Sequence, residues 1–282
     1  AHALMERDLG NINLGLYTKI VGDAKVFGIQ RMQLHFQGEP LINRRFPAMA
    51  RLASDHGMWV QAFTNGLLLD AEYADRIVES GLNRLQFSVD GASEETYQLN
   101  RVGGKFENAY ECMKLMIGKA RGTDLELAWQ FIVLRNNEHE LEKARKMADE
   151  IGIPFIAKTF AESMPDLRPE NPNFQRVVHA KPCTDIYRAI FVYWNGDVVP
   201  CCYDTEGKEI VGSLAEQSLE EIWNSPRYVS LRDRIDHARE NPHAEPGICR
   251  SCLKWGHVAS TQKGKTSVPL SKGAALATQG TD

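Results

Sequence analysis

The sequence has no excess of basic residues, no long apolar run and no cysteine before Cys112. Lys and Arg number 33 against 37 Asp and Glu, so the charge balance does not indicate a nucleic-acid partner. The longest unbroken apolar run, Ala189 to Trp194, is far shorter than the ~18 residues that span a bilayer. The first residues, AHALMERDLG, carry charges where a secretion signal needs an apolar stretch. We therefore expect a cytoplasmic protein without membrane or nucleic-acid partners, in a compartment where disulfides are rare.

Five of the six cysteines lie in the last hundred residues, and their spacing indicates a metal centre. Adjacent Cys201 and Cys202 have Cα atoms ~3.8 Å apart, too close for an unstrained disulfide. Cys249-x-x-Cys252 lets two thiolates bind one centre, and Cys183 with one of the adjacent pair brings the ligands to four. This spacing alone leaves tetrahedral zinc and an iron–sulfur cluster open. The alternative, buried cysteines acting as small apolar groups, does not account for the Cys-x-x-Cys spacing.

In the first 160 residues, amphipathic helical stretches run into a glycine and then directly into a short β-rich run. Glycine suits the position just after a helix because it adopts the left-handed conformation cheaply. We predict strands near 31–36, 58–63, 84–89, 126–133 and 154–159, which this pattern joins as a parallel α/β barrel or open sheet. Asp70 is predicted to cap one helix, and Asn137 with Glu140 resembles a capping box. Functional residues are expected where the strands end.

The pattern changes after residue 160. Residues 161–182 are proline-rich and aperiodic, which predicts a linker between a domain over 1–160 and a second domain over 183–256. In the second domain, Asn195-Gly196 predicts a two-residue hairpin turn, and Ser218 with Glu221 predicts a capped short helix that stops at Pro226. Residues 257–282, rich in small and polar residues, are predicted to be a disordered tail.

Three predicted strands end in similar sequences: HFQGEPL (35–41), FTNG (63–66) and FSVDG (87–91). Each combines glycine with an acidic residue, Asn or Ser, which together form a candidate cradle for a polar small molecule. The alternative is that these are only tight turns, for which Asn-Gly and Asp-Gly are well suited.

The ordered set of motifs from about residue 5 to 256 resembles radical S-adenosylmethionine (SAM) enzymes that carry a C-terminal SPASM or twitch domain. The motifs are QGEP, TNG, SVDG, RVGGKFENA, KPC, WNGDVVPCC, IVGSL, SLEEIWNS and CRSC. The resemblance implies a partial (β/α)6 barrel that binds SAM and a [4Fe–4S] cluster, followed by a small domain with an auxiliary [4Fe–4S] cluster. It also implies hydrogen abstraction from a small-molecule or peptide substrate by a 5′-deoxyadenosyl radical, with an electron donor such as flavodoxin or ferredoxin.

The same resemblance implies a role for individual residues. QGEP matches the family's GGEP-type motif, which receives the amino group of SAM, with Gln37 in place of the first glycine. The strand-end turn at 88–90 matches the one near the SAM ribose and carboxylate, and Arg101 matches an arginine that pairs with this carboxylate. For Arg101 the alternative is a solvated surface charge. The residues thereby assigned to SAM are Gly38, Glu39, Pro40, Asn65, Ser88, Asp90 and Arg101.

For the auxiliary cluster, the family spacing is Cys, about a dozen residues, Gly, four residues and Cys, which Cys183, Gly196 and Cys201 fit. Cys249 and Cys252 complete the implied ligand set. Cys202 is then interpreted as a packed neighbour of Cys201. Cys112, in the helical stretch YECMKLMIGKA, is interpreted as a core residue.

The sequence departs from the family in one respect, because it has no Cys-x3-Cys-x2-Cys loop to ligate the SAM-reducing cluster. We expect that loop, and the first barrel strand, just ahead of Ala1, so the chain resembles a fragment that begins after them. As given, it is not expected to build that cluster. Two other readings stay open: a non-catalytic module with structural zinc, and a SAM-binding scaffold that acts only in a complex. The sequence indicates neither the substrate nor a general base.

Overall fold

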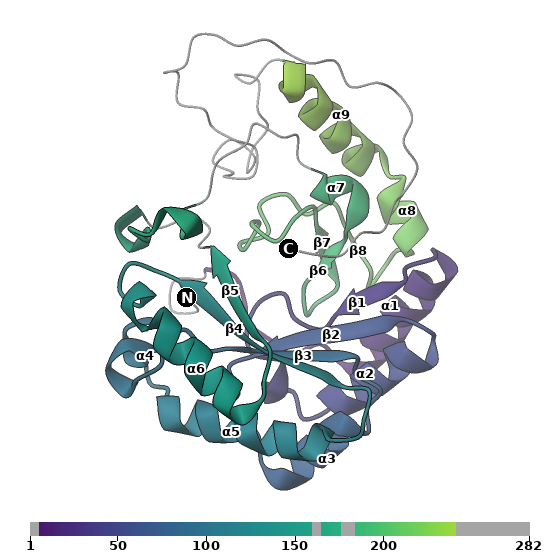
Figure 1. Ribbon diagram of the computed structural model, residues 1–282. Helices are drawn as coiled ribbons and strands as arrows, with labels where there is room; N and C mark the ends of the chain where they lie inside the picture. Colours follow the sequence, from purple (N-terminus) through teal and green to yellow (C-terminus); the bar gives the residue numbers. More distant parts are fainter. Residues whose placement is uncertain (1–5, 160–164, 176–183, 241–282) are drawn as a thin grey trace, which may run out of the picture.

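A five-stranded parallel sheet organises the first part of the chain (Figure 1). The computed structural model describes residues 6–159, 165–175 and 184–240. The strands follow one another in chain order: β1 (Arg31–Gln33), β2 (Trp59–Thr64), β3 (Arg84–Ser88), β4 (Glu126–Val133) and β5 (Phe155–Thr159). The five predicted strands and the partial-barrel fold class are thus confirmed, although β1 ends three residues earlier than expected.

Helices occupy one face of this sheet (Figure 1). Their bounds are α1 (Leu14–Val26), α2 (Phe46–Asp55), α3 (Ala71–Val78), α4 (Glu94–Asn100), α5 (Phe106–Ala120) and α6 (Leu141–Ile151). Each crossover between neighbouring parallel strands passes over the same side, as the single handedness of such units requires. The opposite face, and the loops after the strands, are therefore available for a site.

The sheet is curved. Neighbouring strands lie about 4.8 Å apart, so β2 and β5, with two strands between them, would be roughly 14 Å apart in a flat sheet. Yet the Lys158 ammonium of β5 lies 5.0 Å from the centre of the Phe63 ring of β2. A lysine side chain alone does not cover that separation, so the strands must bend toward each other. We call the side that carries Phe63 and Lys158 the concave face.

Two predicted helix starts differ in outcome. Asp70 caps α3 as predicted, and its carboxylate accepts a hydrogen bond from the Tyr73 backbone N–H at 2.7 Å. The predicted capping box at Asn137 is wrong, because a 3-10 turn, η3 (Glu138–Glu140), precedes α6. The Asn137 side chain instead donates to the backbone carbonyls of Asp90 and Ile132, and the Glu140 carboxylate accepts from Ala92. Both side chains are therefore used in tertiary contacts, mainly with the loop after β3, and not in capping α6.

The C-terminal part contains a small antiparallel sheet in the order β6-β7-β8. Its elements are α7 (Asp185–Arg188), β6 (Phe191–Val192), β7 (Asp197–Val199), β8 (Gly212–Ser213), α8 (Leu219–Trp223) and α9 (Pro226–Glu240). The predicted β6–β7 hairpin is present, but its loop has three residues, because Tyr193 N–H still pairs with the Asp197 carbonyl. Gly196, with φ of 98°, supplies the left-handed residue that such a loop needs. The predicted capping box of Ser218 and Glu221 on α8 is confirmed.

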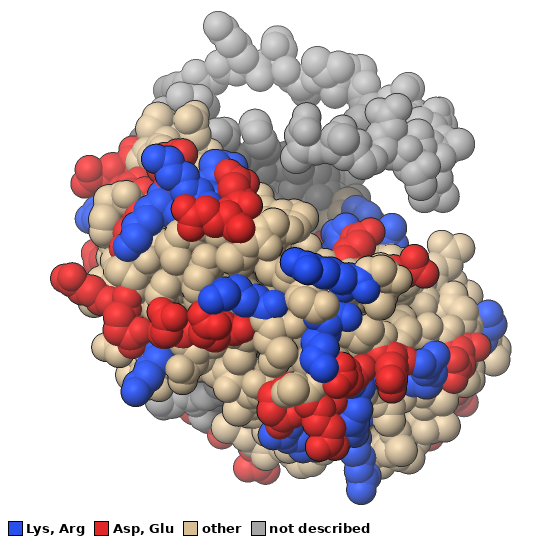
Figure 2. Space-filling view, turned by 60° about the horizontal axis from the view of Figure 1, so that its bottom comes forward, with Lys and Arg blue, Asp and Glu red and all other residues tan. Residues whose placement is uncertain are grey.

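Two hydrophobic cores meet at α1. Val21 belongs to the core between the sheet and its helices, whereas Ile20, the next residue, belongs to the core of the C-terminal part. On the helix-covered side of the sheet, basic and acidic side chains are interspersed (Figure 2). Among the residues that the structure describes, no helix combines the length and the apolar character needed to cross a membrane. The domain boundaries at 160 and 183 stay a prediction.

Candidate functional site

Glu39 joins the loop after β1 to the end of β2. Its carboxylate accepts hydrogen bonds from the Thr64 hydroxyl at 2.7 Å, the Asn65 backbone N–H at 2.6 Å and the Leu41 backbone N–H at 3.1 Å. Burial raises the pKa of the Glu39 carboxyl, while these hydrogen bonds and the charge of Arg101 act in the opposite direction. Two of the predicted SAM residues, Glu39 and Asn65, are therefore in direct contact.

The backbone around Glu39 and Asn65 is tightly turned. Gly38 has φ of 88°, which side-chain-bearing residues rarely adopt, and Pro40 begins the 3-10 turn η2 (Pro40–Ile42). Gly66 has φ of 74°, and a Cβ there would lie 2.9 Å from the Phe87 ring. Both positions therefore require glycine for steric reasons. This agrees with the interpretation of these sequences as tight turns, and it also leaves exposed backbone that can form a cradle.

Asp90, which is buried, and Arg101, which is half-buried, form an ion pair beside this loop. Arg101 donates through Nε at 3.1 Å and through Nη2 at 2.6 Å to the same Asp90 oxygen. The other Asp90 oxygen accepts from the Ile132 backbone N–H at 2.8 Å. Asp90 is 4% exposed and has both oxygens occupied, so it holds Arg101 against the end of β4. Arg101 is therefore not the solvated surface charge of the alternative interpretation, and its Nη1 has no partner among the described residues.

Ser88 ends β3 on the concave face, next to Gln130 of β4. The Ser88 hydroxyl lies 3.5 Å from Gln130 Nε2, and Gln130 Oε1 is buried without a partner in the described structure. Ser88 ends its strand on the side of the sheet where Glu39 and Arg101 lie, and these two are close enough for the Arg101 charge to oppose the rise of the Glu39 pKa. The structure therefore brings the predicted SAM residues to one edge of the sheet. Their donors and acceptors, an arginine N–H, a serine hydroxyl and glycine-rich backbone, fit a zwitterionic methionyl group and a ribose.

The cysteine-rich site is only partly described. Cys201 and Cys202 lie in the turn after β7, and both are half-buried. The other three predicted ligands, Cys183, Cys249 and Cys252, lie outside the described residues. Within the described residues, no three His, Cys, Asp or Glu side chains gather as a metal site. Cys112 is half-buried in α5, where its thiol lies 3.6 Å from the Leu69 carbonyl.

The β6–β7 hairpin is fastened to the first part of the chain by aromatic contacts. The Tyr193 ring stacks on Phe36, at a centroid distance of 5.2 Å, and the Arg7 guanidinium lies 4.0 Å from its centre. The Trp194 indole donates to the Asp8 carbonyl at 3.1 Å, and a Cβ on Gly10 would clash with that indole at 2.5 Å. Phe36 directly precedes the QGEP motif, so the hairpin that leads to Cys201 rests on the predicted SAM loop.

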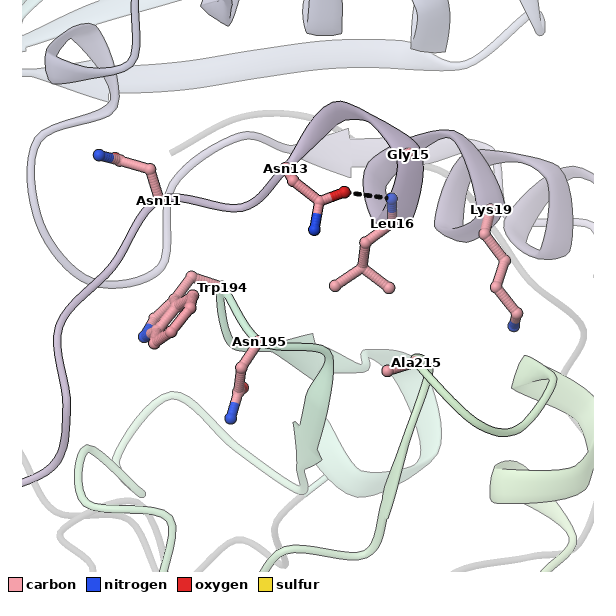
Figure 3. A pocket seen from close by; sticks show the side chains of 8 residues that line it. All are labelled: Asn11, Asn13, Gly15, Leu16, Lys19, Trp194, Asn195 and Ala215. Atoms are coloured by element: carbon pink, nitrogen blue, oxygen red, sulfur yellow. Dashed lines mark hydrogen bonds between the residues drawn. The ribbon is translucent and has the colours of Figure 1, made fainter.

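An open groove of about 530 Å³ lies along this seam, between the start of α1 and the hairpin (Figure 3). Its polar side chains are largely committed to the fold. The Asn13 side chain caps α1 by accepting from the Leu16 backbone N–H, and Lys19 binds Asp23 and the Gln217 carbonyl. We therefore interpret the groove as the junction between the two parts of the chain and not as a binding site. None of the predicted site residues lines it.

Several polar residues on the concave face escaped the sequence analysis, namely His35, Gln86, Gln130 and Lys158. Gln86 and Gln130 are 5% and 6% exposed, in strands that are otherwise apolar. Burial, and secondarily the charge of Lys158, lower the pKa of His35 to about 4, so its imidazole is neutral at neutral pH. The available signal was a glutamine inside each of two buried strands, where an apolar residue is the usual choice.

Comparisons with known proteins agree with this arrangement. Residues 18–149 match the Radical SAM superfamily, and residues 183–253 match an iron–sulfur cluster-binding domain, SPASM. The latter match favours an iron–sulfur cluster over zinc for the cysteine set. Together the two matches imply SAM and [4Fe–4S] clusters as cofactors.

Among curated proteins, the chain is 22% identical to a tungsten-containing aldehyde ferredoxin oxidoreductase cofactor-modifying protein of Pyrococcus furiosus, over 80% of this chain and 76% of that protein. It is 23% identical to a PqqA peptide cyclase of Gluconobacter oxydans, over 89% of this chain and 78% of the cyclase. It is 32% identical to an AdoMet-dependent heme synthase of Methanosarcina barkeri, over 41% of this chain. The chain spans only 32% of that synthase's length.

Solved structures show the same fold. BtrN in complex with AdoMet and 2-DOIA is similar with a TM-score of 0.55 at 17% identity, over 87% of this chain and 82% of BtrN. Native anSMEcpe with bound AdoMet is similar with a TM-score of 0.59 at 15% identity, over 79% of this chain and 75% of that one. The two family matches therefore place residues 18–149 in the radical SAM superfamily and show a C-terminal SPASM domain over residues 183–253.

Proposed function

We propose that this chain is the SAM-binding and auxiliary-cluster part of a radical SAM enzyme that removes a hydrogen atom from a peptide or small molecule. One observation carries the proposal: Glu39, Asn65, Ser88, Asp90 and Arg101, distant in sequence, lie at one edge of the sheet. SAM supplies a 5′-deoxyadenosyl radical when it is cleaved by a reduced iron–sulfur cluster. The peptide cyclase and the cofactor-modifying protein among the relatives support a peptide or small-molecule substrate.

In this proposal each residue has a physical task. Arg101 binds the SAM carboxylate through Nη1, which Asp90 leaves available because it engages only Nε and Nη2. Asp90 acts as a positioning residue, since both of its oxygens are occupied within the protein. The turned backbone from Gly38 to Pro40 receives the amino group, and Glu39 holds that turn against Asn65. The Ser88 hydroxyl, whose described partner is at 3.5 Å, bonds the ribose.

The cysteines are proposed to hold a [4Fe–4S] auxiliary cluster through Cys183, Cys201, Cys249 and Cys252. The SPASM match over 183–253 includes all four. The packing of the hairpin that precedes Cys201 on Phe36, next to the QGEP loop, supports a cluster held close to the SAM site. A protein such as flavodoxin or ferredoxin is proposed as the external electron donor.

The test is SAM binding by the full chain, reconstituted anaerobically with iron and sulfide. Arg101→Gln should weaken SAM binding at least tenfold, about 1.4 kcal/mol, because it removes the charge that faces the carboxylate. Arg121→Gln is the matched control: Arg121 is exposed at the other end of the sheet, at the C-terminus of α5, and should leave the affinity unchanged. Equal SAM affinity in wild type and Arg101→Gln would overturn this assignment.

A further inference from the structure

The concave face carries an ordered array of polar side chains. In the parallel register, Phe63 of β2 lies beside Gln86 of β3, and Ser88 of β3 lies beside Gln130 of β4. Lys158 of β5 lies beside Ile132, two residues beyond Gln130. Side chains two residues apart on a strand share a face, so all of these project to the same side. The alternate residues of these strands, such as Phe87 and Phe131, pack in the helix-covered core instead.

Three buried polar atoms of this array have no hydrogen-bond partner in the described structure: Nδ1 of His35, Oε1 of Gln86 and Oε1 of Gln130. Turning over either carboxamide exchanges an unpartnered oxygen for an unpartnered nitrogen, because in the described structure Gln86 has no hydrogen-bond partner and Gln130 has only Ser88. A buried acceptor left unpaired costs about 1–3 kcal/mol. Three such atoms on one face of a sheet are therefore expensive unless something else satisfies them.

Among the described residues, Lys158 is the charged side chain that lies over Phe63 on this face. The Lys158 ammonium lies over the Phe63 ring at 5.0 Å, and it forms no ion pair with any described residue. The His35 ring meets the edge of Phe63 at 4.2 Å, so Lys158 and His35 flank one aromatic ring. The acidic groups of the candidate SAM site, Glu39 and Asp90, already accept hydrogen bonds within the protein. The array therefore offers one cation, two carboxamides and an imidazole, without an available carboxylate.

We propose that Lys158, Gln86 and Gln130 select a substrate that carries a carboxylate and N–H or O–H donors. The carboxylate pairs with the Lys158 ammonium, and the donors satisfy the two carboxamide oxygens. Phe63, which is apolar, and His35, which is neutral, form the wall between the Lys158 ammonium and the two carboxamides. This inference rests on the proposed function, since it concerns the substrate of that reaction, but its residues are separate from those assigned to SAM.

Three probes separate the parts of this proposal in a binding titration with the reconstituted full chain. N-acetyl-L-glutamate N-methylamide has a carboxylate and N–H donors, its glutamine counterpart has only the neutral donors, and glutarate has only carboxylates. Wild type should bind the glutamate probe at least tenfold more tightly than either of the others. Glutamine and glutamate probes of equal affinity overturn the role of Lys158, and glutarate binding as tightly as the glutamate probe overturns that of the carboxamides.

Variants then assign the effects. Lys158→Met should bind the glutamate and glutamine probes with about equal affinity. Lys146→Met changes an exposed lysine of α6 and should keep the wild-type preference for the glutamate probe. Gln86→Met and Gln130→Met should each lower the affinity for the glutamate probe at least threefold and leave the affinity for glutarate unchanged. Because each removes an unpaired buried acceptor, thermal midpoints should stay constant or rise by a few degrees. A fall in both midpoint and glutarate binding would show a merely structural role and overturn the proposal.

The outcome is independent of the SAM assignment. Arg101→Gln alters SAM affinity, and Lys158→Met is expected to leave SAM affinity as it is. If wild type binds SAM but does not distinguish the three probes, the substrate inference fails while the proposed function stands. If it distinguishes the probes but SAM affinity does not depend on Arg101, the substrate inference stands and the SAM assignment fails.

Discussion

The parallel sheet and the small C-terminal sheet differ in the length of their strands and in the size of the hydrophobic core that stabilises them. Strands β2 to β5 have five to eight residues and a continuous core against the six helices α1 to α6. Strands β6 to β8 have only two or three residues, and their core contains ten buried side chains among the described residues, one of them Ile20 of α1. A unit with so small a core rarely folds without a metal, a disulfide or a neighbour.

This difference indicates where each part obtains its stability. The first part has enough apolar burial to tolerate unpaired polar groups on the concave face, which is typical of a site that a ligand completes. The C-terminal part depends on the contacts with α1 and Phe36 and, in our proposal, on the auxiliary cluster. Point substitutions can separate these sources of stability.

The largest effect is expected at Cys201. A cluster ligand must be a thiolate that points at iron, so Cys201→Ser should abolish stable cluster binding and loosen the region over 184–240. Cys202→Ser should retain about four iron atoms per chain and cost only ~0.5–3 kcal/mol, as ordinary point substitutions do. Iron content, visible absorption and the thermal midpoint of both variants provide the measurement. Loss of iron from Cys202→Ser alone would reverse the assignment of the two cysteines.

The second effect concerns Asp90. Asp90→Asn leaves the half-buried Arg101 without its ion-pair partner and should destabilise the first part by about 1–3 kcal/mol, between the costs for exposed and fully buried pairs. The matched control is Asp75→Asn, which breaks an exposed pair with Lys119 and should cost under about 1 kcal/mol. Chemical denaturation of each variant gives the free energies of unfolding. Equal costs at the two positions would show that the Asp90 pair is no more than a surface contact.

These cases show how far the sequence alone leads. Glycines after helical stretches, together with short β-rich runs, were sufficient to predict five strands, because a helix stop and a parallel strand are both local patterns. Asp70 was predicted correctly because its partner, Tyr73, is three residues away. The Asn137 prediction failed because Asp90, 47 residues earlier, supplies the carbonyl that its side chain binds.

The candidate site shows the same limit. Family motifs identified Asp90 and Arg101, but their mutual ion pair depends on the fold of α4. Gln86 and Gln130 were overlooked because a buried parallel strand is apolar on both faces, so its sequence does not reveal which face is concave. The curvature of the sheet, which brings Lys158 over Phe63, is a property of all five strands together.

The third prediction is a pH dependence that arises from the concave face. The pKa of His35 is lowered from 6.5 to about 4, by burial first and by facing Lys158 second. Because the folded pKa is depressed, the stabilising contribution is present above pH 6.5 and is lost as pH falls toward 4. At 1.36 kcal/mol per unit, this loss is at most about 3 kcal/mol. Denaturation between pH 7 and 4 should show it in wild type and show a smaller slope in His35→Gln; identical slopes would count against a buried neutral imidazole.

The smallest effect tests the shared helix α1. Ile20→Val removes one methyl group from the C-terminal core, and Ile77→Val removes one from the core of the first part, each costing about 0.5–1.5 kcal/mol. Although Ile20 lies on a helix of the first part, we expect Ile20→Val to speed amide hydrogen exchange mainly in peptides from 191–235. Ile77→Val should speed exchange in the peptides of β2, β3 and α3. If both substitutions change only the first part, then α1 does not support the C-terminal core, and the auxiliary cluster and the Phe36 contacts alone must hold that region in place.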